Sequence, residues 1–255
     1  MKIAFCLFGK VGGEGNKSGS SKPSQEMLEM GHSFYKKNLF DIHDNVDVFV
    51  HSWDADVKED ILNTYKPKEY IIEDQIKFSI PKYVRGTPHR KQCHYSRWYS
   101  TKIATSLYDP SEYDMAIVTR FDIAWQNQLD FSTLNRDDFY VGNWCAYGRP
   151  DKYKGGRGTL KVGGLEHWLK TIKDHGFLDF WFISNPAALQ KFGNLYDNLN
   201  EYNKPGNCPT DTSNSISNHR LAKYHADKLN LNIQQELYLY KDFPLIRRHY
   251  FGCNK

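Results

Sequence analysis

The chain has 255 residues, of which 40% are hydrophobic and 15% aromatic, and its 34 basic and 30 acidic side chains give a formal net charge of +4. This composition excludes an intrinsically disordered chain and does not demand a nucleic-acid partner. The length suits one large α/β domain or two small ones, and we find no linker that would separate two. The five cysteines are widely spaced and lack the pairs of a zinc site, so we expect reduced thiols in the cytoplasm.

The first half of the chain alternates strand and helix patterns. Apolar runs predict strands at 3–8, 46–50, 70–72 and 115–118, and amphipathic patterns predict helices at 21–40, 56–65 and 92–107. Repeated β-α-β units favour a largely parallel sheet flanked by helices. No run of about 18 apolar residues occurs, so we expect no membrane span.

A glycine-rich loop, residues 9–19, follows the first strand. It fails the P-loop pattern because Asn16 stands where a glycine must precede Lys17, and its glycines have the wrong spacing for a dinucleotide fingerprint. The loop still permits a tight turn at Gly9, whose amides together with Lys10 can meet a nucleotide.

The second half contains a short strand at 139–141, a strand at 177–183 and helices at 164–174, 186–200 and 215–229. Residues 146–164 are rich in glycine and basic side chains, which fits an active-site lid and equally a solvated surface loop. Asp179 interrupts an apolar run. Since a buried carboxylate without a partner is costly, this side chain is either paired or functional.

Arg120 and Asp122 follow the strand at 115–118, in the segment Thr119-Arg120-Phe121-Asp122. The period of two in a strand predicts that both side chains emerge on the same side, at the edge where open α/β sheets bind ligands. A guanidinium suits phosphate oxygens and a carboxylate suits a divalent ion. A structural ion pair explains the same spacing, and both interpretations stay open. For His51 and His219 a structural role likewise competes with ligand binding.

The order of several motifs resembles one known family. Residues 2–10, 46–54, 94–104 and 113–125, followed by 139–145, 176–185 and 242–252, are similar to GT-A-type glycosyltransferase-like proteins of bacterial surface-polysaccharide clusters and bacteriophage genomes. The resemblance implies a single Rossmann-like GT-A domain over residues 1–255. Residues 1–125 would bind a nucleotide-sugar donor, and residues 126–255 would form the acceptor side.

In that family an Asp-x-Asp element after a central strand holds Mn²⁺ or Mg²⁺ and the donor diphosphate. Here the matching place reads Arg120-Phe121-Asp122, so Arg120 is expected to contact phosphate and Asp122 to bind the metal or the ribose. The donor-binding residues that we expect are Gly9, Lys10, His51, Trp53, Arg97, Arg120, Asp122 and Arg157.

Glycosyl transfer further requires a group that deprotonates the acceptor hydroxyl. Asp179 is the first candidate, and His219 and Asp211 follow it. The acceptor would be a glycan, a small molecule or a modified base of phage DNA. Two alternatives remain: a sulfo- or phosphotransferase that uses another anionic donor, and a non-catalytic protein that binds carbohydrate or nucleic acid.

Overall fold

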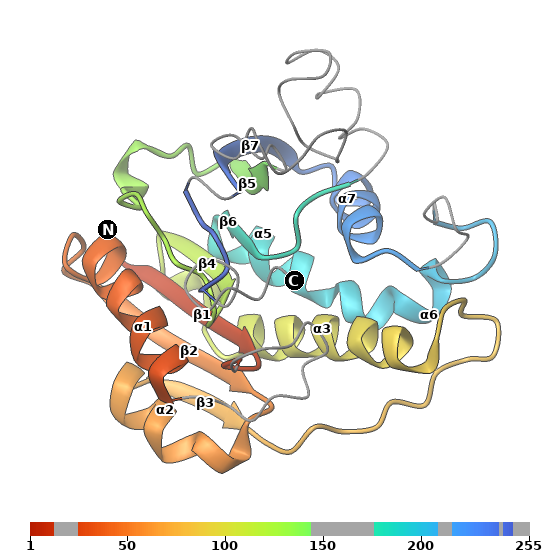
Figure 1. Cartoon of the computed structure of the whole chain (residues 1–255). Coiled ribbons are helices and arrows are strands. Elements are labelled where there is room, and N and C mark those ends of the chain that lie inside the picture. Colours follow the sequence, from red (N-terminus) through yellow and green to blue (C-terminus); the bar gives the residue numbers. More distant parts are fainter. Residues whose placement is uncertain (13–24, 144–175, 209–215, 240–241, 247–255) are drawn as a thin grey trace, which may run out of the picture.

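The computed structural model describes residues 1–12, 25–143, 176–208, 216–239 and 242–246. Their strands form one seven-stranded sheet in the order β3-β2-β1-β4-β6-β5-β7 (Figure 1). The strands are β1 (Ile3–Gly9), β2 (Val46–Ser52), β3 (Glu69–Ile72), β4 (Met115–Arg120), β5 (Asp138–Asn143), β6 (Trp181–Ser184) and β7 (Asn232–Tyr238). β6 is antiparallel to its neighbours β4 and β5, and the other pairs are parallel. The expected α/β class with a mostly parallel sheet is therefore confirmed.

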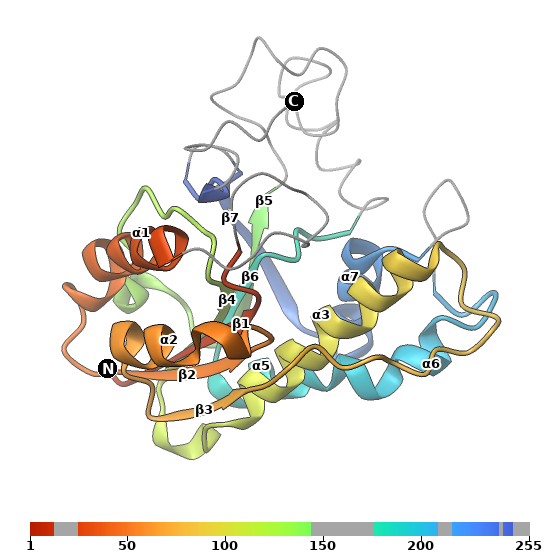
Figure 2. The same cartoon turned by 60° about the horizontal axis from the view of Figure 1, so that its bottom comes forward.

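Helices cover both faces of this sheet. They are α1 (Gln25–Tyr35), which continues as a π-helical turn (Lys36–Phe40), α2 (Lys58–Tyr65), α3 (Pro88–Ser106), α5 (Pro186–Gly193), α6 (Leu199–Tyr202) and α7 (Asn218–Lys228). Short 3₁₀ turns lie at Ala55–Val57, Pro110–Glu112, Phe131–Thr133 and Asn194–Asn198. Figure 2 shows α1 and α2 on one side of the sheet and α3, α5 and α7 on the other. None of the described helices combines the length and the apolarity needed to cross a bilayer.

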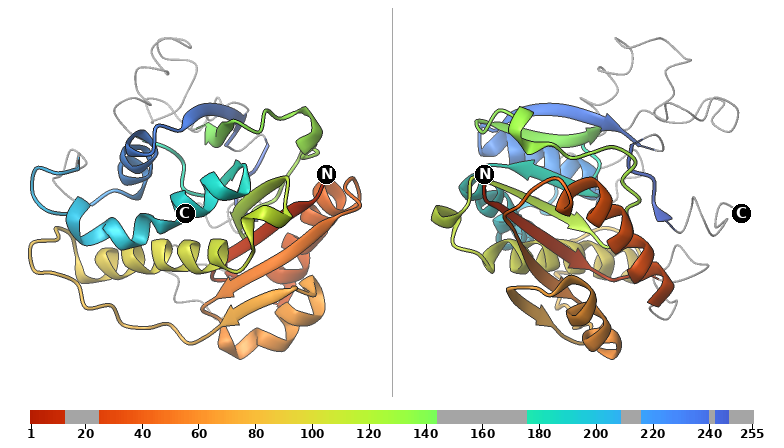
Figure 3. Two further views of the ribbon diagram at one scale, coloured as in Figure 1. Left: turned by 180° about the vertical axis from the view of Figure 1, so that it is seen from behind. Right: turned by 90° about the vertical axis from the view of Figure 1, so that its left-hand side faces the viewer.

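The alternation of side chains along β1 explains the two layers of helices. Ile3, Phe5 and Leu7 belong to the core cluster that includes α1 and α2, whereas Ala4, Cys6 and Phe8 belong to the cluster that includes α3, α5 and α7. A strand that is apolar at every position must be buried on both faces. Figure 3 shows the layers from two further sides, with strands side by side in its right-hand view.

Three sequence predictions need correction. The strand expected at 177–183 begins only at Trp181, and residues 176–180 precede it without regular structure. The helix expected at 186–200 is interrupted, because α5 ends at Gly193 and a 3₁₀ turn separates it from α6. β7 was not predicted, because its sequence, NIQQELY, carries few apolar residues. The expected lid at 146–164 and helix at 164–174 fall outside the described residues.

The carboxyl-terminal part of the described chain returns to the segment that follows β4. The amide of Ala124 donates to the carbonyl of Pro244 at 2.9 Å, and the amide of Ile246 donates to the carbonyl of Asp122 at 2.9 Å. These bonds fix the backbone of Asp122 from a position more than a hundred residues away along the chain.

Two buried histidines, His94 and His225, make the stability of this fold depend on pH. Burial lowers the pKa of each imidazole to about 4, whereas an unfolded histidine titrates near pH ~6.5. The unfolded chain therefore binds these protons first, so the stability is complete above about pH 6.5 and falls as the pH drops towards 4. At pH 5 we expect the free energy of unfolding to be lower than at pH 7.5 by about 2 kcal/mol per histidine, as measured by urea denaturation at the two pH values. His225→Gln should shrink the difference, and equal midpoints at both pH values would contradict the prediction.

Candidate active site

The carboxyl ends of β1 and β4 meet the amino end of β6 at one edge of the sheet. β1 pairs with β2 on one side and with β4 on the other, so the direction in which the chain winds reverses between β1 and β4. Open α/β sheets bind ligands outside the strand ends at such a reversal. Since β6 runs antiparallel, with Trp181 opposite Thr119, the residues before Trp181 lie beside the end of β4.

Arg120 and Asp122 form a bidentate ion pair at this edge. The Nε of Arg120 donates to Oδ1 of Asp122 at 2.8 Å, and Nη2 donates to Oδ2 at 2.7 Å. Asp122 is 1% exposed, whereas the Arg120 side chain is 24% exposed. Phe121 points the other way into the core, as predicted, and the Phe180 ring lies 5.2 Å from the Arg120 guanidinium. The pair thus presents a cation to solvent and keeps its anion inside.

A second charged cluster joins three elements that are distant in the sequence. Asp179, before β6, lies 3.5 Å from Nε of Arg97 on α3 and 3.3 Å from Nδ1 of His219 on α7, measured from its two carboxylate oxygens. Arg97 also donates to the backbone carbonyl of Asp179 and to the hydroxyl of Thr101. Its guanidinium lies over the Phe8 ring, 3.9 Å from the centroid, so the end of β1 supports it.

Electrostatics link the two clusters. Burial alone would raise the pKa of Asp179, but the positive charges of His219, Arg97 and Arg120 outweigh burial and hold this pKa below its ordinary value. Burial lowers the pKa of Arg97 to about 9. The negative charge of Asp179 opposes this shift, whereas the positive charge of Arg120 lowers the pKa of Arg97 further. At neutral pH the site therefore contains two arginines that repel each other and a carboxylate that both attract.

The loop after β1 faces the same edge. Gly9 has a φ of +92°, which turns the chain in a way that side chains with a Cβ rarely allow. The amide of Val11 then donates to Oδ2 of Asp54 at 2.6 Å. Burial raises the pKa of the Asp54 carboxyl, and the nearby ammonium of exposed Lys10 partly offsets the effect. Gly9 and Lys10 therefore follow the end of β1 beside Arg120, whose strand pairs with β1 through Phe8.

His51 and Trp53 lie behind this edge, in the interior. The amide of Gly9 donates to the Ser100 hydroxyl at 2.8 Å. Because Nε2 of His51 faces the Glu73 carboxylate at 3.2 Å, it carries the ring proton, and Nδ1 accepts from the Ser100 hydroxyl at 2.6 Å. His51 is fully buried, and the Trp53 ring is stacked on Tyr99 at 5.3 Å. These contacts give His51 the role of tying β1, β2 and α3 together.

Two expected site residues, Asp211 and Arg157, fall outside the described residues. Sequence reasoning missed Asp54 and Phe180, although both carry a usable signal. Asp54 ends the same buried run as His51, and the carboxyl end of that strand reaches the ligand edge. Phe180 directly follows Asp179, which was singled out.

A divalent ion fits these residues poorly as they stand. Both carboxylate oxygens of Asp122 accept hydrogen bonds from Arg120, so an ion would compete with a guanidinium for them. Within the part of the chain that the structure describes, no three His, Cys, Asp or Glu side chains come together as a metal site. The Asp122 carboxylate is thus already paired with a cation that the protein itself supplies, the Arg120 guanidinium.

Comparison with known proteins assigns the chain to no group. No family model matches it, and no curated protein matches it significantly.

Proposed function

We propose that this protein is a glycosyltransferase that moves a sugar from a nucleotide-sugar donor to a hydroxyl acceptor. One observation carries the proposal: the basic and acidic side chains of α3, β4, α7 and the segment before β6 converge at the sheet edge where the winding reverses. That edge is the usual ligand-binding edge of an open α/β sheet.

The donor diphosphate would lie between the β1 loop and Arg120. Lys10 is exposed in that loop, and the Arg120 guanidinium is held in a fixed orientation by Asp122. A preorganised cation stabilises the negative charge that develops as the nucleoside diphosphate departs, because it need not reorient during the reaction. Arg97 adds a second positive charge from a buried position.

His219 is the group that we propose as the general base. Its side chain is 28% exposed and its Nδ1 faces Asp179, so the carboxylate orients the ring. Asp179 itself is buried with a lowered pKa, which makes it a poor base and a good orienting group. In an inverting reaction His219 would take the acceptor proton while the acceptor oxygen bonds to the anomeric carbon and the bond to the diphosphate breaks.

We further propose that the domain is of the GT-A type. The Arg-x-Asp segment begins at the last residue of β4, a central strand parallel to β1, and the resemblance places the Asp-x-Asp element at the end of such a strand. Because Arg120 occupies both oxygens of Asp122, we propose that this arginine supplies the charge which Mn²⁺ or Mg²⁺ provides elsewhere in the family.

A thermal-shift screen tests this function. UDP-, GDP-, CMP- and dTDP-sugars, ATP and a sulfonucleotide are each added with Mn²⁺, with Mg²⁺ or with EDTA. We expect at least one nucleotide sugar to raise the melting temperature by about 5 °C when its concentration is roughly a hundred times its Kd, and EDTA to leave that gain in place. Stabilisation by ATP or a sulfonucleotide alone would favour the rival transferases, and the absence of any nucleotide effect would contradict the proposal.

A further inference from the structure

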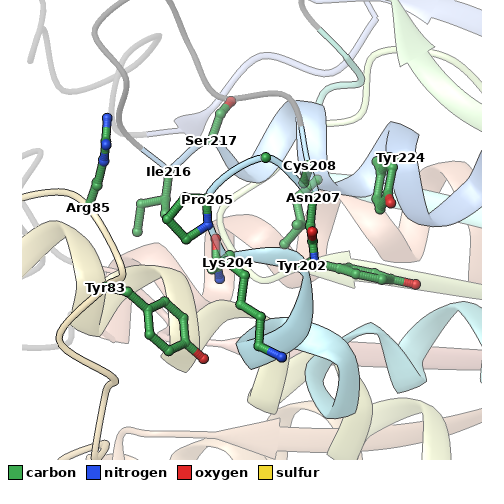
Figure 4. A pocket seen from close by; sticks show the side chains of 13 residues that line it. Tyr83, Arg85, Tyr202, Lys204, Pro205, Asn207, Cys208, Ile216, Ser217 and Tyr224 are labelled. Atoms are coloured by element: carbon green, nitrogen blue, oxygen red, sulfur yellow. The ribbon is translucent and has the colours of Figure 1, made fainter.

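A pocket of about 630 Å³ lies between the segment before α3, the turn after α6 and the start of α7 (Figure 4). Its volume is in the range of roughly 300–1,000 Å³ that small-molecule sites occupy. The residues that shape its chemistry are Tyr83, Arg85, Tyr202, Asn203, Asn207 and Tyr224. None of them belongs to the site described above.

Aromatic rings and amides dominate this lining. Three tyrosines contribute, and the rings of Tyr202 and Tyr224 meet edge to face with centroids 5.0 Å apart. Tyrosine rings offer a flat apolar surface with a polar tip, and asparagine amides both donate and accept hydrogen bonds. The rings suit the apolar C–H face of a sugar. Because the Tyr83 hydroxyl and the Asn203 and Asn207 amides already donate within the protein, their oxygen atoms would accept hydrogen bonds from the sugar hydroxyls.

The charge of the pocket is also specific. Lys204 is neutralised by Glu201, with Nζ and Oε2 2.5 Å apart. Arg85 is exposed, and its guanidinium forms no hydrogen bond or ion pair with any described residue. Among the described residues no side chain therefore neutralises the Arg85 guanidinium, which favours a ligand with a carboxylate or another anionic group.

A buried histidine connects the pocket wall to the proposed base. Nε2 of His94 accepts a hydrogen bond from the side-chain amide of Asn203 at 3.2 Å, and its Nδ1–H donates to Oδ1 of Asn218 at 2.5 Å. Asn218 directly precedes His219 on α7. Ser217, Leu221 and Tyr224 line the pocket and recur every three to four residues, so one face of α7 closes the pocket while His219 lies on another face.

We propose that this pocket is a secondary acceptor subsite that anchors a glycan through an acidic sugar unit, such as a uronic acid. The assignment to the acceptor rests on the proposed glycosyltransferase function, whereas the binding itself does not. An occupied pocket would fix Asn203 and, through His94 and Asn218, the start of the helix that carries His219.

An array of uronic-acid, sialic-acid and neutral oligosaccharides tests the proposal, with titration of the bound glycans in solution. We expect the wild-type protein to bind acidic glycans in preference to neutral ones. Arg85→Gln should weaken binding about tenfold, because a charge-assisted hydrogen bond is lost, and Tyr224→Ala should abolish it. Lys82→Gln is the matched control, since this exposed cation is close in sequence to Arg85 but does not line the pocket.

The melting temperature and the nucleotide-sugar shift of each variant are measured alongside. We expect Arg85→Gln to keep both, because its side chain is exposed and unpaired within the described chain. Binding of neutral glycans as tightly as acidic ones, binding of none, or unchanged binding by both variants would overturn the proposal. If the variants lose acidic-glycan binding while no nucleotide sugar stabilises the wild-type protein, the glycan-binding pocket would be upheld and the proposed transferase function refuted.

Discussion

Replacing Arg120 by lysine is expected to remove most of the donor-induced thermal shift and to lower kcat/KM for transfer by about 10²- to 10³-fold. Lysine keeps the charge but has no planar fork, so it cannot hold two oxygens of Asp122 and meet a phosphate in a fixed orientation. Thermal shift with the best nucleotide sugar measures the first effect, and release of the nucleoside diphosphate measures the second.

Two further variants make the Arg120 result interpretable. Asp122→Ala should also abolish the thermal gain, since it frees the guanidinium from its bidentate pair and leaves it without orientation. Arg136→Lys is the matched control, because Arg136 forms an exposed ion pair with Asp114 at 3.2 Å, and such pairs contribute about 0–1 kcal/mol. If Arg120→Lys bound and used the donor as well as Arg136→Lys does, the assigned role of Arg120 would be wrong.

Replacing His219 by glutamine is expected to lower the rate of transfer by about 10²- to 10⁴-fold while donor binding persists. Glutamine retains a hydrogen-bonding side chain of similar length but cannot accept a proton at neutral pH. The wild-type nucleotide-sugar shift and a low kcat, measured on the same preparation, would together separate proton transfer from donor binding.

Asp179→Asn tests the role of His219 through the carboxylate that contacts its Nδ1. We expect it to lose activity and also about 3–5 kcal/mol of stability, because the buried guanidinium of Arg97 loses its counter-charge.

His43→Gln is the control for His219→Gln, since the Nε2 of His43 contacts the carbonyl of Leu129 at 2.8 Å, a bond that glutamine can replace. Full transfer activity in His219→Gln would exclude this histidine as the base.

The first half of the fold follows closely from sequence patterns. The strands β1, β2, β3 and β4 and the helix α3 lie within a few residues of their predicted positions, because their apolar residues recur with strand or helix periodicity. The second half was harder to predict. β7 has little apolar signal, since it lies at the end of the sheet and its side chains are only partly buried where described.

The candidate site divides in the same way. Arg120 and Asp122 were predicted as neighbours because the strand period of two places side chains two positions apart on the same side. The meeting of Arg97, Asp179 and His219 was not predicted, although each residue was named separately. His51 was expected to bind the donor, but its two ring nitrogens engage Ser100 and Glu73.

The amino-acid sequence by itself determined the α/β class, the buried strands and the paired charges at the end of β4, because these depend on local periodicity and on the burial of apolar side chains. Only the tertiary structure decided which distant charges share a site. The antiparallel direction of β6 brings Asp179 to the carboxyl ends of β1 and β4 rather than to the opposite edge. No local pattern encodes that direction, since it results from the pairing of strands that are far apart in the chain.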